Sequence, residues 1–197
     1  MKIHWKRTVW RMVLASAVLT AFTQTAGAQN PGIDPALLIK ASTGDAAAQV
    51  LVGEIYAAGK GVERDLKQAA EWYRKAAEKG DVSGQIHLAA LYRDGGKGFA
   101  RDMVLAAEWY RKAAELGDPG AQGTLGLLYA YGQGVAHNDV EAYYWLDLAA
   151  AAKGPNQEKY AANRQMIGTH ITAEELEAVQ GRVAKWLAAH PRPVAIE

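Results

Sequence analysis

Small, apolar and charged residues recur with the period of an α-helix along residues 44–153, in pairs of segments. In the segment 46–58, Val52, Ile55 and Tyr56 lie at helical spacing among alanines. In the run AAEWYRKAAE, small and aromatic residues fall on one helical face and charged residues on the other. This run is identical at 69–78 and 106–115. We therefore predict helical hairpins, each made of a first and a second helix.

Three copies of this hairpin follow one another along the chain. They span residues 44–79, 80–116 and 117–153, and a tryptophan recurs at the same position of each second helix. Repeats of this length are typical of solenoids, in which units stack because a single hairpin cannot bury its own apolar face. The predicted fold class is therefore all-α, a right-handed α-solenoid of three stacked hairpins.

Glycine, Asp and Asn residues predict where the helices end and begin. Glycines can adopt the positive φ that ends a helix and opens a turn, and they occur between the two helices of each hairpin at 59–61, 95–98 and 132–134. Side chains suited to capping precede the second helices at Asp65, Asp102 and Asn138.

Additional helices are predicted to cover both ends of the stack. Residues 29–43 contain Asp34 and Pro35, a capping residue followed by proline at the first helical position, so this segment resembles a second helix without a first. Residues 154–190 hold a short helix from Gln157 to Ile167. A longer helix follows, which a Thr172–Glu175 capping box opens.

The second helix of the third unit supports the docking of these C-terminal helices. It carries Tyr144, Leu148 and Ala151 where the other two copies have Glu, Lys and Glu. A charged face that becomes apolar in the last copy is expected to be covered. Leu176, Val179, Val183, Trp186 and Leu187 form the apolar face of the predicted last helix, and residues 191–197 are predicted to be a disordered tail.

The repeated frame resembles the SEL-one-like repeat (SLR), a relative of the tetratricopeptide repeat. In the first unit it is carried by Gln49, Gly53, Tyr56, Gly59, Gly61, Val62, Asp65, Ala69, Trp72, Tyr73, Ala76, Ala77 and Gly80. In the third it is carried by Ala121, Gln122, Leu125, Gly126, Tyr129, Gly132, Gly134, Val135, Trp145, Ala149 and Ala150. The resemblance implies an adaptor or scaffold for other proteins, and in exported bacterial members a role in envelope assembly, host contact or the control of membrane sensors. A cysteine-rich branch linked to β-lactam binding or hydrolysis pairs its helices by disulfides, and this chain has no cysteine.

The first 28 residues have the composition of an export signal. They contain four basic residues and no acidic one, an apolar stretch from Met12 to Phe22, and small residues at Ala26-Gly27-Ala28. We expect cleavage after Ala28 and a periplasmic or secreted protein without a membrane span; an uncleaved anchor is the alternative. The remaining chain is then net acidic, which gives no electrostatic basis for nucleic-acid binding.

Candidate catalytic chemistry is sparse. There is no cysteine and no His-Glu-x-x-His pattern, and the glycines at 95–98 recur at the repeat period, which indicates a turn rather than a phosphate site. We therefore predict no catalytic residue, metal or cofactor.

Variation among the three copies identifies a candidate binding surface. Positions that differ between units lie on one stripe of the first helices, which line the concave side in solenoids of this kind. His87 interrupts an apolar pattern, and it is either a partner-facing residue or a structural histidine. The candidate partner-binding residues are Val50, Glu54, His87, Arg93, Asp94, Thr124, Leu127 and Tyr131. Drift of unselected exposed residues would produce the same variation.

The resemblance therefore implies a periplasmic or secreted adaptor or scaffold, and the variable stripe is where we expect it to bind a partner protein or peptide, on the concave face. Two alternatives stay open: a small-molecule (β-lactam-like) binding or hydrolytic protein, and a structural envelope component that self-associates. The sequence leaves the partner and the oligomeric state undetermined.

Overall fold

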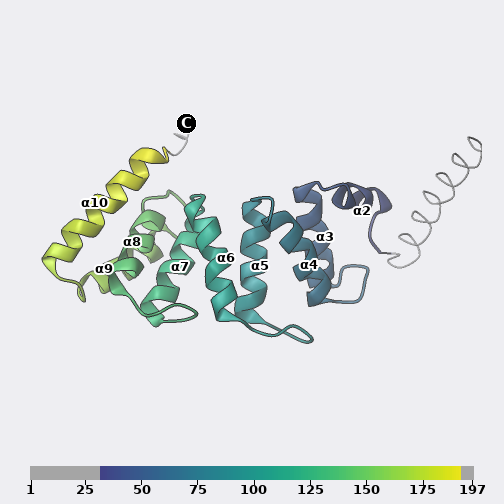
Figure 1. The fold of residues 1–197 in the computed structure, drawn as a ribbon, viewed down its shortest axis with the longest axis horizontal. Helices are drawn as coiled ribbons and strands as arrows, with labels where there is room; N and C mark the ends of the chain where they lie inside the picture. Colours follow the sequence, from purple (N-terminus) through teal and green to yellow (C-terminus); the bar gives the residue numbers. More distant parts are fainter. Residues whose placement is uncertain (1–31, 192–197) are drawn as a thin grey trace, which may run out of the picture.

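The computed structural model describes residues 32–191, and helices make up most of this region (Figure 1). The predicted signal peptide and residues 192–197 of the predicted tail lie outside it. The helices are α2 (Pro35–Ser42), α3 (Ala46–Ala58), α4 (Leu66–Ala77), α5 (Val82–Asp94), α6 (Met103–Glu115), α7 (Pro119–Tyr131), α8 (Asp139–Ala150), α9 (Gln157–Gly168) and α10 (Ala173–Ala189).

The helices form a row of hairpins, as the sequence predicts. The pairs α3/α4, α5/α6 and α7/α8 are the three hairpins, and each second helix also packs on the first helix that follows it. Figure 1 shows the row running from α2 at one end to α8, α9 and α10 at the other. The all-α solenoid with a cap at each end is therefore confirmed. Across residues 32–191, no helix combines the length and the apolar character that a membrane crossing requires.

The predicted caps are present at the helix ends. The carboxylates of Asp65 and Asp102 each accept two backbone N–H groups at the start of α4 and α6, and Asn138 accepts one at the start of α8. Gly59 and Gly132 end α3 and α7 with φ angles of 69° and 62°. The hairpin turns therefore follow from the local sequence.

A buried glutamine fastens each first helix to the second helix before it. Gln85 donates to the carbonyl of Ala77 at 3.3 Å, and Gln122 donates to that of Ala114 at 3.1 Å. Gln49 makes the same bond to Ala41 of α2 at 3.0 Å. Because α2 provides the same carbonyl acceptor as α4 and α6 do, it takes the place of a second helix, as predicted for the N-terminal cap.

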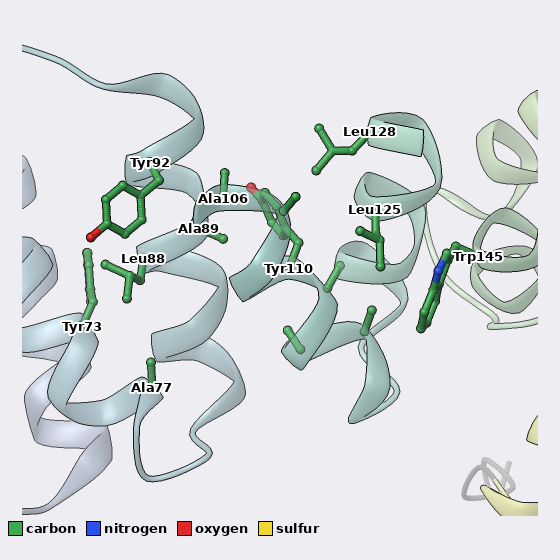
Figure 2. Packing of buried hydrophobic residues seen from close by; sticks show 14 of the residues in the cluster. Tyr73, Ala77, Leu88, Ala89, Tyr92, Ala106, Tyr110, Leu125, Leu128 and Trp145 are labelled. Carbon is green, nitrogen blue, oxygen red and sulfur yellow. The ribbon is translucent and has the colours of Figure 1, made fainter. Parts of the chain in front are cut away.

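The core is a continuous layer of small and aromatic side chains between the helices. Leu88, Leu125 and Leu146 are completely buried, and Tyr73 and Tyr110 are each 3% exposed. Figure 2 shows Tyr73, Leu88, Tyr110 and Leu125 directed into the space between neighbouring helices. The alanines and the tyrosine of the run AAEWYRKAAE are therefore packing positions.

The last helix covers the apolar face of α8. Arg182 of α10 lies 2.8 Å from a carboxylate oxygen of Glu141, and its guanidinium lies 4.4 Å from the ring centroid of Tyr144. Tyr144 and Leu148 are buried, which confirms the predicted cover at these positions, whereas Ala151 is exposed. The contacts of α10 are mainly with α8, so α9 and α10 do not pair as the other hairpins do.

Candidate interaction surface

The first helices expose corresponding positions in all three units, and we call this surface the first-helix stripe. All of its side chains are half-exposed or exposed. They are Leu51, Glu54 and Ala58 on α3, His87, Ala90, Arg93 and Asp94 on α5, and Thr124, Leu127 and Tyr131 on α7. Positions three and seven residues apart share one helical face. Helices α3 and α5 contact each other directly, so the stripe is continuous across the first two units.

His87 joins the first two units at this surface. Its Nε2 atom lies 3.2 Å from a carboxylate oxygen of Glu54, and its ring stacks on Tyr73 with the centroids 4.9 Å apart. Burial and the negative charge of Glu54 raise the pKa of the Tyr73 hydroxyl. The His87 side chain nevertheless stays 40% exposed. His87 therefore has structural contacts and also a solvent-exposed edge.

Arg93 and Asp94 form a second polar group at the end of α5. The Nε atom of Arg93 lies 2.7 Å from an Asp94 carboxylate oxygen, and its Nη1 atom donates to the Tyr110 hydroxyl at 3.0 Å. The hydrogen bond from Arg93 lowers the pKa of Asp94. Asp94 is therefore ionised at neutral pH. Because Tyr110 also holds Arg93, the guanidinium is fixed relative to the second helix.

Arginines of the invariant run hold the next first helix in register. Arg74 of α4 donates to the Tyr92 hydroxyl at 2.5 Å, and Arg111 of α6 donates to the Tyr129 hydroxyl at 2.6 Å. Tyr92 and Tyr129 occupy the same position in α5 and α7. The repeated run thus forms the joint between units and positions the stripe, but it is not part of it.

Val50 does not belong to the surface, contrary to the sequence prediction. Its side chain is 7% exposed and contributes to the core, whereas Leu51 is 49% exposed. Successive residues of a helix are rotated by about 100°, so one position separates the buried side from the exposed side. Leu51 therefore takes the place assigned to Val50.

The three remaining predicted residues lie on α7. Tyr131 is 62% exposed at the end of the helix. Leu127 is half-buried against the core. The hydroxyl of Thr124 donates to the carbonyl of Gly120 at 2.9 Å within the same helix. Tyr131 is thus the most accessible side chain of this group, and Thr124 has a local partner for its hydroxyl.

Sequence comparison of the units missed the contact between α7 and α9. Gly123 stands where the other units have Val50 and Ile86, and a Cβ at Gly123 would lie 2.1 Å from a ring carbon of Tyr160. The glycine therefore makes room for the C-terminal cap. Variation at this position reflects packing, and the only indication in the sequence was a glycine in the middle of a helix.

The described residues contain no group of three or more His, Cys, Asp or Glu side chains placed to hold a metal ion. The exposed stripe instead offers the His87–Glu54 contact and the Arg93–Asp94 ion pair beside apolar and aromatic side chains, a combination found in protein interfaces. The fold defines the class of protein as an α-solenoid of helical repeats.

Comparison with known proteins identifies the family. The Sel1 repeat model matches residues 46–81, 82–118 and 119–153, and the chain belongs to the Sel1 repeat family. A Sel1 repeat protein from Oxalobacter formigenes has a similar structure, with 37% identity, a TM-score of 0.57, and an alignment that covers 66% of this chain and 94% of the other. A search of curated proteins finds no match.

A weaker structural match is c5321, a protective antigen with an SLR fold from uropathogenic Escherichia coli. It is 22% identical with a TM-score of 0.40, and the alignment covers 82% of this chain and 52% of the antigen. Sel1 repeat proteins generally mediate protein–protein interactions and are typically non-catalytic scaffolds.

Proposed function

We propose that this protein is an exported adaptor that binds a partner protein or peptide on the first-helix stripe, which forms its concave face. The observation that supports the proposal is the contrast between the residues at the joints between units and the residues of the stripe. The joints between units repeat the same contacts, whereas the exposed stripe differs in charge and shape from unit to unit. The proposal includes no catalytic role for the chain.

Three features of the stripe suit a protein partner. The contact of Glu54 with His87 and the ion pair of Arg93 with Asp94 are held in place by tyrosines of the core. Leu51 and Tyr131 add exposed apolar area. Side chains that are already ordered lose little conformational entropy when a partner binds, which favours affinity from a small surface.

Export through the N-terminal signal is part of the proposal. It predicts that the protein purified from the native envelope begins at Gln29, which mass spectrometry of the intact chain would test. A mature chain that retains Met1–Ala28 would contradict cleavage and support an anchor.

Site-specific photo-cross-linking tests the binding surface. A photoreactive amino acid at Tyr131 is expected to capture a distinct partner in envelope preparations, and one at Glu71, on the exposed side of α4, is the control. Equal capture from both positions would contradict binding by the stripe. A cross-linked dimer of the chain itself would support the self-associating structural component instead.

A further inference from the structure

The residue before the glycine that ends each first helix differs between the units. It is Ala58 in the first unit, Asp94 in the second and Tyr131 in the third. The second unit therefore contains an Asp–Gly pair, Asp94–Gly95, and the sequence has no other Asp–Gly and no Asn–Gly. The pair lies at the end of the stripe on α5, where the side chain of Asp94 is 59% exposed.

An Asp–Gly pair can rearrange without any co-reactant except water, because glycine has no side chain that hinders the approach of its nitrogen. The backbone nitrogen of Gly95 attacks the Cγ carbon of Asp94 and forms a C–N bond. The nitrogen loses its proton, and the carboxyl oxygen leaves as water, which closes a succinimide ring. Water then opens the ring. Attack at the side-chain carbonyl restores aspartate, whereas attack at the backbone carbonyl yields isoaspartate, whose main chain runs through Cβ and Cγ.

The turn after α5 requires the glycine of this pair. Gly95 has a φ of 63°, in the left-handed region, and a Cβ at this position would lie 3.0 Å from the backbone nitrogen of Arg101. A residue with a side chain would be strained here. The reactivity of the pair is therefore controlled by the residues around it rather than by the choice of the second residue.

Two contacts oppose the rearrangement in the folded chain. The N–H of Gly95 donates to the carbonyl of Leu91 at 2.8 Å, which holds the nitrogen at the end of α5. Arg93 holds both carboxylate oxygens of Asp94, through Nε at 2.7 Å and Nη2 at 3.0 Å. This hydrogen bonding, together with the charges of Arg93 and Arg101, lowers the pKa of Asp94. Because an ionised carboxylate does not release its oxygen as water, the pairing with Arg93 slows ring closure.

The arginine is present only in the unit that has the aspartate. The corresponding residues are Ala57 and Ala130, and the residues that follow them carry no carboxylate. Arg93 is itself held by the Tyr110 hydroxyl, which accepts a hydrogen bond from Nη1 at 3.0 Å. The contacts from Tyr110 through Arg93 to Asp94 therefore keep the guanidinium on the carboxylate.

We propose that Asp94–Gly95 is the succinimide-forming site of this chain, and that Arg93 restrains its conversion to isoaspartate. The conversion inserts a methylene group into the main chain at the end of α5 and displaces the carboxylate. An aged chain then presents an altered stripe in its second unit. The rearrangement is a property of the chain alone and does not depend on a partner.

Ageing of the purified chain tests the proposal. The wild type and Arg93→Gln are incubated in the folded state at several values between about pH 5 and about pH 8. A protease that cleaves after lysine then releases the peptide 80–97 from both chains, and chromatography with mass spectrometry measures its isoaspartate. Isoaspartate is expected at Asp94 in both, formed at least about threefold faster in Arg93→Gln, because losing an adjacent opposite charge leaves more of the carboxyl protonated. The rate should rise toward low pH, and the rise should begin at a higher pH in Arg93→Gln.

Arg111→Gln is the matched control. It removes the corresponding bond to a tyrosine hydroxyl, that of Tyr129, away from Asp94, and should leave the isoaspartate rate unchanged. Asp94→Asn should convert faster than the wild type, since an amide needs no protonated carboxyl. Hydrogen exchange of the Gly95 amide should be similar in the wild type and in Arg93→Gln, which separates loss of the arginine from fraying of α5.

Several results would overturn the proposal. Equal rates in the wild type and Arg93→Gln, or equal acceleration by Arg111→Gln, would remove the role of Arg93. Gly95 amide exchange that accelerates by the same factor as isoaspartate formation would assign the effect to the helix end. An Asp94→Asn chain that does not convert, or isoaspartate that forms at another aspartate first, would disprove the site itself.

Discussion

Gly53 lies where α3 crosses α4, and its lack of a side chain lets the two helices approach. A Cβ at this position would lie 2.5 Å from a ring carbon of Tyr73. Gly126 has the same relation to Leu146 in the third unit, with a distance of 2.7 Å, while the second unit has the buried Ala89. The sequence marks Gly53 and Gly126 as part of the repeated frame, but only the structure assigns them to helix crossings.

Gly53→Ala is expected to lower the free energy of unfolding by about 1–3 kcal/mol, because the added methyl group displaces Tyr73 from a packed core. Urea unfolding followed by circular dichroism would measure the change. Gly181→Ala in α10 is the control, since nothing lies within 4 Å of its Cβ. That change should stabilise the chain by up to about 1 kcal/mol. A neutral Gly53→Ala would contradict the close crossing.

Glu175 provides a prediction on pH. Hydrogen bonds from the Thr172 backbone N–H and hydroxyl lower the pKa of Glu175 below its ordinary value of 4.5. Because the folded pKa is the lower one, the capping box stabilises α10 fully above pH 4.5 and loses this effect as the pH falls through the folded pKa. A carboxyl titration by NMR should show a midpoint below 4.5 that rises in Thr172→Ala. A midpoint at or above 4.5 in the wild type would disprove the capping role.

At the scale of helices, the sequence predicts which helices exist and where they end better than it predicts which helices pack together. The apolar change at Tyr144 and Leu148 indicates that something covers α8, and α10 does cover it. The sequence predicted that the C-terminal helices cover α8, but it did not predict that α10 largely bypasses α9. Periodicity identifies which face of a helix is buried but carries no information about which neighbour buries it.

Val179→Ala should loosen α10 selectively. Val179 is completely buried, and removing its two methyl groups is expected to cost about 2 kcal/mol. Hydrogen exchange is expected to become faster in α10 and in the part of α8 beneath it, while α3 to α6 stay protected, because repeat units stabilise only their neighbours. Exposed Gly181→Ala in the same helix is the control. Uniformly faster exchange along the chain would contradict local docking.

For the whole molecule, repetition made the order of units predictable, since each unit must pack on the next. The exposure of seven of the eight candidate residues could be predicted, because positions that differ between copies fall on one helical face. The exceptions depend on contacts between units. Val50 is buried, whereas its neighbour Leu51 is exposed. Gly123 makes room for Tyr160 of α9.

The central claim is that the first-helix stripe binds a partner, and one comparison of affinities tests it most directly. The partner that photo-cross-linking identifies would be purified, and calorimetry would compare its binding to the wild type and to two triple variants. One carries Glu54→Ala, Asp94→Ala and Tyr131→Ala on the stripe; the other carries Lys67→Ala, Glu71→Ala and Glu78→Ala on α4. Arg93 is left in place because it also holds Tyr110. The stripe variant is expected to lose about 2–4 kcal/mol of binding free energy with little change in unfolding temperature, and the α4 variant to bind like the wild type. Equal affinity of all three chains would contradict the account.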